Sequence, residues 1–119
     1  MDLNISPKEN IATASIYDVE IEDCEADRPE LPRRQRFYSS VTDSKILESG
    51  KHYKDLPNYV SITILSYDPF NAGDMFYKAE TVLTSHPNII YDEGRIHIFL
   101  YAHGNPNFKD NSVKFSSEN

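Results

Sequence analysis

Three acidic residues alternate with apolar ones in the segment IYDVEIEDCE, residues 16–25, with the spacing of one strand face. The acidic positions are Asp18, Glu20 and Glu22. Successive side chains of a strand point to opposite faces, so these carboxylates project together while the apolar side chains between them pack behind. Carboxylates aligned in this way repel one another unless water solvates the face or cations neutralise it. The segment therefore predicts either a solvated strand face or a face that binds a metal ion for chemistry.

The length and composition indicate one folded domain. At 119 residues the chain can bury a modest core, and 39% hydrophobic with 12% aromatic residues is too rich a composition for a disordered chain. Nineteen Asp and Glu residues against twelve Lys and Arg residues give a net charge of −7. This charge supplies no general attraction to nucleic acid, so any binding to DNA is expected to be weak.

Cysteine and histidine usage argues against a disulfide or a zinc site. Cys24 is the only cysteine, so no disulfide can form within the chain and a reducing compartment is expected. The four histidines match no zinc-binding spacing, and His97 is expected to be a surface or hydrogen-bonded strand residue. The N-terminus, MDLNISPKEN, lacks the basic start and apolar core of a secretory signal, and no apolar run is long enough to span a membrane. We expect a cytoplasmic protein without membrane contact.

The elements that must position the acidic face are predicted from the pattern around it. Residues 15–22 are expected to form a strand. Pro32 suits the first turn of a helix because no amide donor is needed there, and Gly50 is typical of a helix end. The helix between them is expected to bury one side through Phe37 and Val41.

The second half of the chain is rich in strand signals. NYVSITILSY, residues 58–67, is nearly continuous in β-branched and aromatic residues, which predicts a central strand buried on both faces. Four of its side chains are expected to be deeply buried: Val60, Ile62, Ile64 and Leu65. A turn in YDPFNAGD precedes a predicted strand at residues 75–83 and a hairpin at residues 89–102 that bends at DEG. Residues 1–104 are expected to form the domain and residues 105–119 a flexible tail.

Three segments carry a resemblance to a known family: YDVEIE at residues 17–22, the spacer ESGKHYKDLP at residues 48–57, and SYDPF at residues 66–70. In this order they closely resemble the PD-(D/E)xK nuclease family transposases, also called recombination-promoting nucleases, over residues 15–103. The resemblance implies an α/β fold, with α+β as the alternative. The expected architecture is a mixed β-sheet flanked by helix, a reduced restriction-endonuclease-like core.

The same resemblance implies a metal-dependent DNA endonuclease that hydrolyses phosphodiester bonds during recombination or transposition, with Mg²⁺ or Mn²⁺ as cofactor. In the family an Asp, a Glu and the carbonyl after that Glu bind the ion, and a Lys or Gln two residues after the Glu positions the attacking water. Carried onto this chain, the metal ligands are Asp2, Glu20 and Ile21, and Glu22 is the substitute water-positioning base. Asp2, Glu20 and Glu22 are thus the implied catalytic residues. Only Met1 precedes Asp2, so the family's first helix and strand are expected to be missing.

The helix supplies further expected site residues. The family's role implies DNA contacts by a basic cluster, Arg33, Arg34 and Arg36. In an acidic chain the same cluster is expected instead to neutralise the nearby carboxylates of residues 23–30. Tyr38 lies four residues after Arg34 and therefore on the same side of the helix, where it is expected either to line the site or to serve plain packing.

A catalytically inactive remnant is the alternative to the nuclease. It would act as a folded interaction or regulatory module, with a second copy or an intact family member as its partner. The open edge along residues 15–22 invites another strand to pair with it. Two copies joined edge to edge would bring their acidic residues together, so a strand at residues 2–5 is the favoured cover, and it would carry Asp2 toward Glu20.

Overall fold

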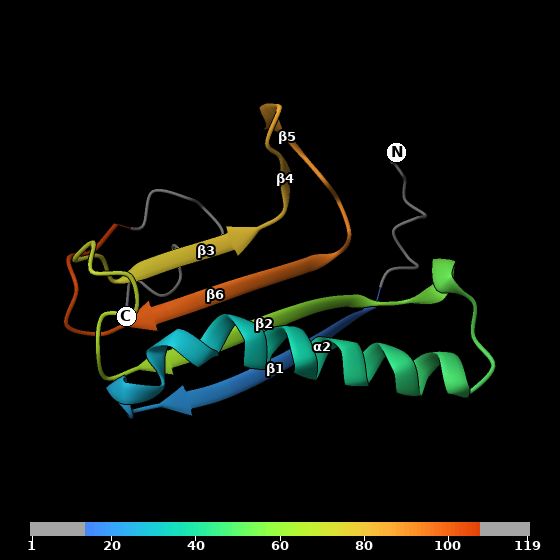
Figure 1. Ribbon diagram of the computed structural model, residues 1–119, viewed down its shortest axis with the longest axis horizontal. Helices are drawn as coiled ribbons and strands as arrows, with labels where there is room; N and C mark the ends of the chain where they lie inside the picture. Colours follow the sequence, from blue (N-terminus) through green and yellow to red (C-terminus); the bar gives the residue numbers. More distant parts are fainter. Residues whose placement is uncertain (1–13, 108–119) are drawn as a thin grey trace.

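The computed structural model describes residues 14–107, which form a four-stranded mixed sheet, one long helix and a small hairpin (Figure 1). The strands of the main sheet, in spatial order, are β1 (Ser15–Glu22), β2 (Asn58–Leu65), β6 (Arg95–Tyr101) and β3 (Phe76–Glu80). β1, β2 and β6 are parallel, and β3 runs antiparallel to β6. The predicted mixed sheet flanked by a helix is confirmed, and β2 lies in the interior of the sheet as expected.

Helix α2 (Leu31–Glu48) follows the short helix η1 (Glu25–Glu30) and lies across one face of the sheet (Figure 1). Pro32 stands in its first turn, and Gly50, just beyond its end, has a φ of 94°, a conformation that costs glycine little. The predicted helix is confirmed at both ends. No helix within residues 14–107 is long and apolar enough to cross a membrane.

The side of α2 that faces the sheet is largely polar. Its buried residues are Leu31, Gln35 and Ser39, whereas Phe37 is 62% exposed. The expected buried side through Phe37 and Val41 is therefore wrong for Phe37. Gln35 Nε2 donates to Thr63 Oγ1 at 2.8 Å, and hydrogen bonds of this kind allow polar side chains to occupy the buried side.

The two faces of β2 differ in cover. Tyr59, Ser61, Thr63 and Leu65 face α2 and are buried. On the opposite face Ile64 is 41% exposed. Val60 and Ile62 are only half-buried, so the expected deep burial of all four apolar residues is confirmed for Leu65 alone. Helix α2 lies over the other face of the sheet, so Val60, Ile62 and Ile64 are on the face that it does not cover (Figure 1).

The predicted hairpin at residues 89–102 is wrong. β5 (His86–Ile90) pairs with β4 (Val82–Leu83), while β6 pairs with β2 and β3. The Tyr59 amide donates to the Gly94 carbonyl at 2.7 Å and thereby starts β6 beside β2. The predicted strand at residues 75–83 is correspondingly divided into β3 and β4, and the small β4–β5 hairpin projects from the main sheet (Figure 1).

The apolar core is small and lies where β2 ends. It consists of Leu31, Leu65, Tyr67 and Phe99, with Tyr77 packed against it. The loop after β2 is fastened by Asp68, whose carboxylate accepts hydrogen bonds from the Tyr77 hydroxyl and from the amides of the turn predicted in this loop. Asp2, the predicted strand at residues 2–5 and residues 108–119 of the predicted tail lie outside the described residues.

Candidate functional site

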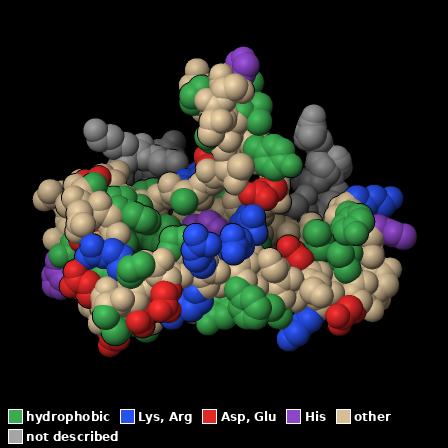
Figure 2. All heavy atoms as spheres, viewed as in Figure 1, with side chains coloured by type: hydrophobic (Ala, Val, Ile, Leu, Met, Phe, Trp, Pro, Cys, Tyr) green, Lys and Arg blue, Asp and Glu red, His purple; other side chains and the backbone are tan. Residues whose placement is uncertain are grey.

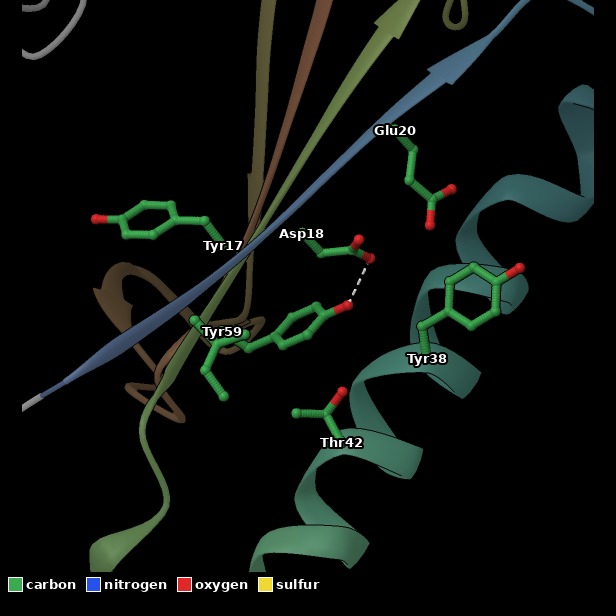
Figure 3. A pocket seen from close by; sticks show the side chains of 7 residues that line it. Tyr17, Asp18, Glu20, Tyr38, Thr42 and Tyr59 are labelled. Carbon is green, nitrogen blue, oxygen red and sulfur yellow. Dashed lines mark hydrogen bonds between the residues drawn. The ribbon is translucent and has the colours of Figure 1, made fainter.

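A cavity of about 360 Å³ opens between β1, β2 and α2 on the helix-covered face (Figure 3). Its polar lining comes from all three elements: Asp18 and Glu20 of β1, Tyr59 of β2, and Tyr38 and Thr42 of α2. The pairing of β1 with β2 explains why Asp18 lies near Tyr59. Asp18 lies beside Ser61 in register, and Tyr59, two residues before Ser61, projects from the same face of the sheet. Sequence segments more than forty residues apart in the chain thus form one site.

The acidic face of β1 is turned toward α2. Asp18, Glu20 and Glu22 are half-buried, and the alternating apolar residues are exposed, Tyr17 at 65% and Val19 at 58%. The prediction that the three carboxylates share one face is confirmed. The expectation that the apolar side chains pack behind them is wrong, because within residues 14–107 the only helix of the main sheet covers the acidic side.

Tyr59 fixes the position of Asp18. The Tyr59 hydroxyl donates to Asp18 Oδ2 at 2.8 Å (Figure 3). Burial of the phenol, and then this bond to a carboxylate, raise the pKa of Tyr59 well above its ordinary value. The phenol therefore stays protonated and acts only as a donor toward Asp18 at neutral pH.

Glu20 carries charge that its surroundings do not balance. Burial, followed by the negative charge of Asp18, raises the pKa of Glu20, and the positive charge of Arg34 only partly opposes this shift. Two carboxylates in one half-buried cavity favour either a shared proton or a bound cation. The cavity is thus an acidic site in which Glu20 is harder to ionise than a carboxyl group in water.

Glu22 has a different environment. Arg34 Nη2 lies 2.7 Å from Glu22 Oε1, and the Cys24 amide donates to Glu22 Oε2 at 3.2 Å. The Glu22 side chain is only 11% exposed. The residue expected to position water therefore uses one carboxylate oxygen to hold the end of β1 against α2 and the other to fix the turn that follows β1.

The predicted basic cluster does not form a single patch. Residues 34 and 36 lie about 200° apart around a helix, so Arg34 faces β1 while Arg36 faces the other side. Arg36 lines a second cavity of about 210 Å³ together with Arg95 and His97. Figure 2 shows Lys and Arg side chains gathered over this part of the helix-covered face. Arg33 is exposed to solvent.

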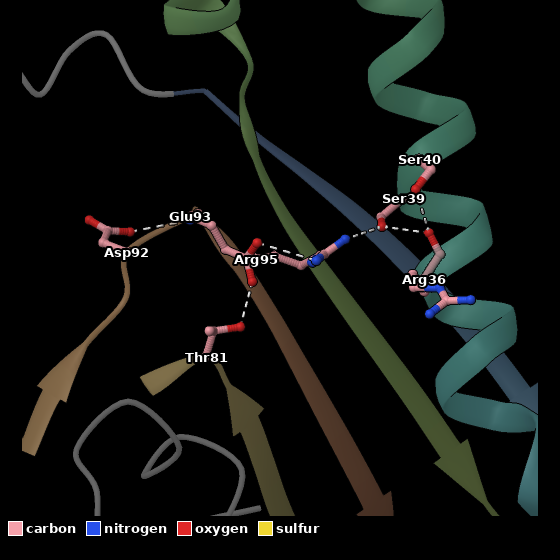
Figure 4. A network of polar contacts seen from close by, with 8 residues as sticks. Arg36, Ser39, Ser40, Thr81, Asp92, Glu93 and Arg95 are labelled. Carbon is pink, nitrogen blue, oxygen red and sulfur yellow. Dashed lines mark hydrogen bonds and ion pairs between the residues drawn. The ribbon is translucent and has the colours of Figure 1, made fainter. Parts of the chain in front are cut away.

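A network of polar contacts fixes the second cavity (Figure 4). Arg95 Nη1 donates to Ser39 Oγ at 2.9 Å, and Arg95 Nη2 lies 3.2 Å from Glu93 Oε1. Ser61 Oγ and His97 Nδ1 are 2.7 Å apart, so His97 is the hydrogen-bonded strand residue that was expected. Arg95 is thus tied on both sides, and Arg36 is the basic residue of this cavity without a partner among the described ion pairs.

The carboxylates of the cavity suit a cation that takes one or two oxygen ligands from the protein and the remainder from water. Within residues 14–107 no three or more His, Cys, Asp or Glu side chains converge on one metal position. Mg²⁺ commonly takes one or two carboxylates and keeps water in its remaining positions, which Asp18 and Glu20 satisfy. The carbonyls of Ala14 and Glu22 accept hydrogen bonds from the amides of Asn58, in β2, and Ser66, just after β2. Successive carbonyls of a strand point to opposite sides, so the Ile21 carbonyl faces the edge of β1 that lies away from β2. Asp2 lies outside the described residues, and its proposed place as a ligand stays a prediction.

Comparison with protein-family models, with curated proteins and with solved structures found no match to this chain. The site must therefore be interpreted from its own geometry. Tyr38 lines the cavity, as one of its two expected roles required. Thr42 and Tyr59 were not predicted as site residues. A signal existed for Thr42, which lies one helical turn after Tyr38, whereas Tyr59 is placed only by the pairing of β1 with β2.

Proposed function

We propose that the cavity binds Mg²⁺ or Mn²⁺ through Asp18 and Glu20 and that the protein hydrolyses phosphodiester bonds of DNA. The observation that carries the proposal is that these two carboxylates line one half-buried cavity, where burial and the negative charge of Asp18 raise the pKa of Glu20. The resemblance of YDVEIE to the metal-binding strand of the nuclease family supports the choice of a nucleic acid as substrate.

The described side chains have separate roles in this proposal. When bound, the ion would polarise the phosphoryl group and lower the pKa of a coordinated water. Tyr59 orients Asp18 through its 2.8 Å hydrogen bond. Tyr38 places a phenol at the cavity, where its hydroxyl can donate to a phosphate oxygen. The exposed Arg33 and Arg36 supply local positive charge in a chain whose net charge is −7.

The pairing of Arg34 with Glu22 favours a second function for the same fold. A Lys or Gln at position 22 would donate a hydrogen bond to the attacking water, whereas a carboxylate held by Arg34 at 2.7 Å cannot. A noncatalytic module that still binds the ion, and that acts through interaction with another chain, is therefore the alternative function.

Cleavage of supercoiled plasmid DNA in millimolar Mg²⁺ or Mn²⁺ tests the proposal. We expect the wild-type chain to nick the plasmid and Glu20→Gln to lower the rate on the order of 10³-fold, the loss of several kcal/mol of transition-state stabilisation. Glu48→Gln makes the same chemical change at an exposed position at the end of α2 and should leave the rate unchanged.

Mn²⁺-induced broadening of backbone amide signals supplies a readout that does not depend on cleavage. We expect broadening at residues 18–22 in the wild-type chain and its loss in Glu20→Gln. Broadening without plasmid cleavage would assign the site to the noncatalytic module. Absence of both effects would overturn the metal site and the nuclease together.

A further inference from the structure

The second cavity, of about 210 Å³, lies on a different side of α2 from the acidic cavity. Arg36 lines the second cavity and Tyr38 the acidic one, and side chains two positions apart project about 200° apart around a helix. From the sheet, His97 of β6 and Ala79 of β3 line the second cavity and lie side by side in register. The small side chain of Ala79 leaves space next to the imidazole.

Arg95 is held in place at this cavity by other parts of the protein. Arg95 Nη1 donates to Ser39 Oγ at 2.9 Å and Nη2 lies 3.2 Å from Glu93 Oε1, so the guanidinium reaches from the start of β6 toward α2 (Figure 4). A guanidinium has five N–H donors, and these two contacts leave others for a further acceptor. The Arg95 side chain is still 30% exposed. Arg95 is therefore an ordered donor that a ligand does not have to immobilise.

Arg36 brings a second positive charge to the same place. It precedes Ser39 by three residues and therefore lies on the same side of α2 as the contact between Ser39 and Arg95. The Arg36 side chain is exposed and takes part in none of the ion pairs found among residues 14–107. Its charge is thus available to a ligand.

The two carboxylates that line the second cavity are already paired. Glu93 is paired with Arg95. Glu80 Oε1 lies 3.9 Å from Lys78 Nζ. With these pairs formed, Arg36 is left as an uncompensated positive charge in a chain whose net charge is −7. The second cavity is thus a local positive site on an acidic protein.

His97 supplies a third donor. Its Nδ1 lies 2.7 Å from Ser61 Oγ, which leaves Nε2 as the ring nitrogen for a ligand. When the Ser61 hydroxyl donates to Nδ1, the neutral ring carries its proton on Nε2 and donates from there. Burial, and then the positive charge of Arg95, lower the pKa of His97, while the negative charge of Glu93 opposes this shift. An anion beside His97 would raise the pKa again because it favours the imidazolium form.

We propose that the second cavity binds a phosphate group through Arg36, Arg95 and His97. The donors come from α2 and from two positions of β6, and their convergence from several directions suits the tetrahedral oxygens of phosphate better than a flat carboxylate. The backbone phosphate of a nucleic acid and free inorganic phosphate share this chemistry. The site goes beyond the proposed nuclease function, because it requires neither the metal ion nor DNA cleavage.

NMR titration of the full chain with sodium phosphate tests the proposal, at neutral pH in EDTA and at constant ionic strength. We expect the side-chain signals of Arg95 and His97 to shift with a dissociation constant of about 1–10 mM. The pKa of His97 should be higher in phosphate than in chloride of the same ionic strength.

Arg36→Gln removes the uncompensated charge and should weaken phosphate binding about tenfold. The variant is expected to fold normally because Arg36 is exposed and holds no ion pair among the described residues. The matched control, Lys45→Gln, removes one positive charge from an exposed position in the last turn of α2 and should bind phosphate as the wild type does.

A thymidine oligonucleotide, added without divalent ions, distinguishes the two sources of phosphate. Shifts at the same side chains that appear at lower concentration than with inorganic phosphate, and that Arg36→Gln weakens, support the site with a nucleic-acid backbone as its ligand. Shifts with inorganic phosphate but not with the oligonucleotide support the site with free phosphate as its ligand.

Three results would overturn the proposal. The first is a wild-type chain whose Arg95 and His97 signals do not move at tens of millimolar phosphate. The second is binding that Arg36→Gln leaves unchanged, because phosphate then uses another surface. The third is equal weakening by Arg36→Gln and Lys45→Gln, which would show a response to overall charge rather than to this cavity.

Discussion

Arg34 on α2 and Glu22 at the end of β1 form an ion pair 2.7 Å long that joins the helix to the acidic strand. The pair joins the two elements that supply most of the site. It also neutralises the charge of Glu22, so Asp18 and Glu20 are the carboxylates that line the cavity. The chemistry of the cavity therefore depends on a contact between residues twelve positions apart.

Replacement of Glu22 by Gln distinguishes the nuclease from the noncatalytic module. Gln keeps an oxygen that accepts from Arg34, loses the oxygen that accepts from the Cys24 amide, removes one negative charge and supplies an amide donor for water. We expect Glu22→Gln to raise the rate of metal-dependent plasmid cleavage about tenfold or more, while it lowers the free energy of unfolding by about 1 kcal/mol through the weaker pair. Initial rates of nicking and urea unfolding measure the two effects. A rate that falls instead would identify Glu22 as a functional base.

The pH dependence of stability should reveal Glu20. Because the pKa of Glu20 is raised in the folded state above its ordinary value of 4.5, its contribution to stability is fully present below pH 4.5 and is lost as pH rises through the folded-state pKa. Glu20→Gln should therefore be more stable than the wild type at neutral pH, with little difference below pH 4.5. Thermal unfolding across this range, without divalent ions, provides the measurement. Equal stability of the two proteins at neutral pH would contradict the raised pKa.

The contribution of His97 to stability should change with pH in the direction opposite to that of Glu20. Its burial, and then the positive charge of Arg95, lower the pKa of His97 below its ordinary value of 6.5. The unfolded state therefore binds the proton more readily, and the stability that neutral His97 contributes is present above pH 6.5 and lost as pH falls through the folded-state pKa. We expect His97→Gln to reduce the loss of stability on acidification below pH 6.5, measured by urea unfolding at successive pH values. An unchanged pH profile in the variant would assign the loss to other groups.

The two faces of the sheet should respond differently to truncation. Phe99 is 3% exposed in the core and packs edge-on against Phe70 at 5.0 Å, so Phe99→Ala should lower the free energy of unfolding by about 3–5 kcal/mol. Val19 is 58% exposed on the face of the sheet opposite α2, so Val19→Ala should lower the free energy of unfolding by less than about 0.5 kcal/mol. Chemical denaturation at a concentration where the chain is monomeric gives both values. A comparable loss of unfolding free energy in Phe99→Ala and Val19→Ala would mean that other residues of the same chain bury the side chain of Val19.

Local patterns in the sequence determined the elements and the composition of their faces. Alternation at residues 15–22 predicted β1 and the common face of its three carboxylates, and Pro32 with Gly50 predicted both ends of α2. Such features depend on the geometry of a few neighbouring residues, through the two-residue period of a strand and the missing amide of proline, and therefore need no tertiary information.

Only the tertiary structure decided which face is covered and which distant side chains meet. A period of two shows that β1 has an acidic and an apolar face, but it does not say which one α2 covers, and the acidic one is covered because Arg34, Gln35 and Ser39 find polar partners there. The Asp18–Tyr59 bond and the division of residues 89–102 between two sheets depend on strand pairing across long stretches of chain. Hydrogen bonds between remote residues satisfy buried polar groups that a local pattern assigns to solvent, which is why the sequence alone placed the apolar side inward.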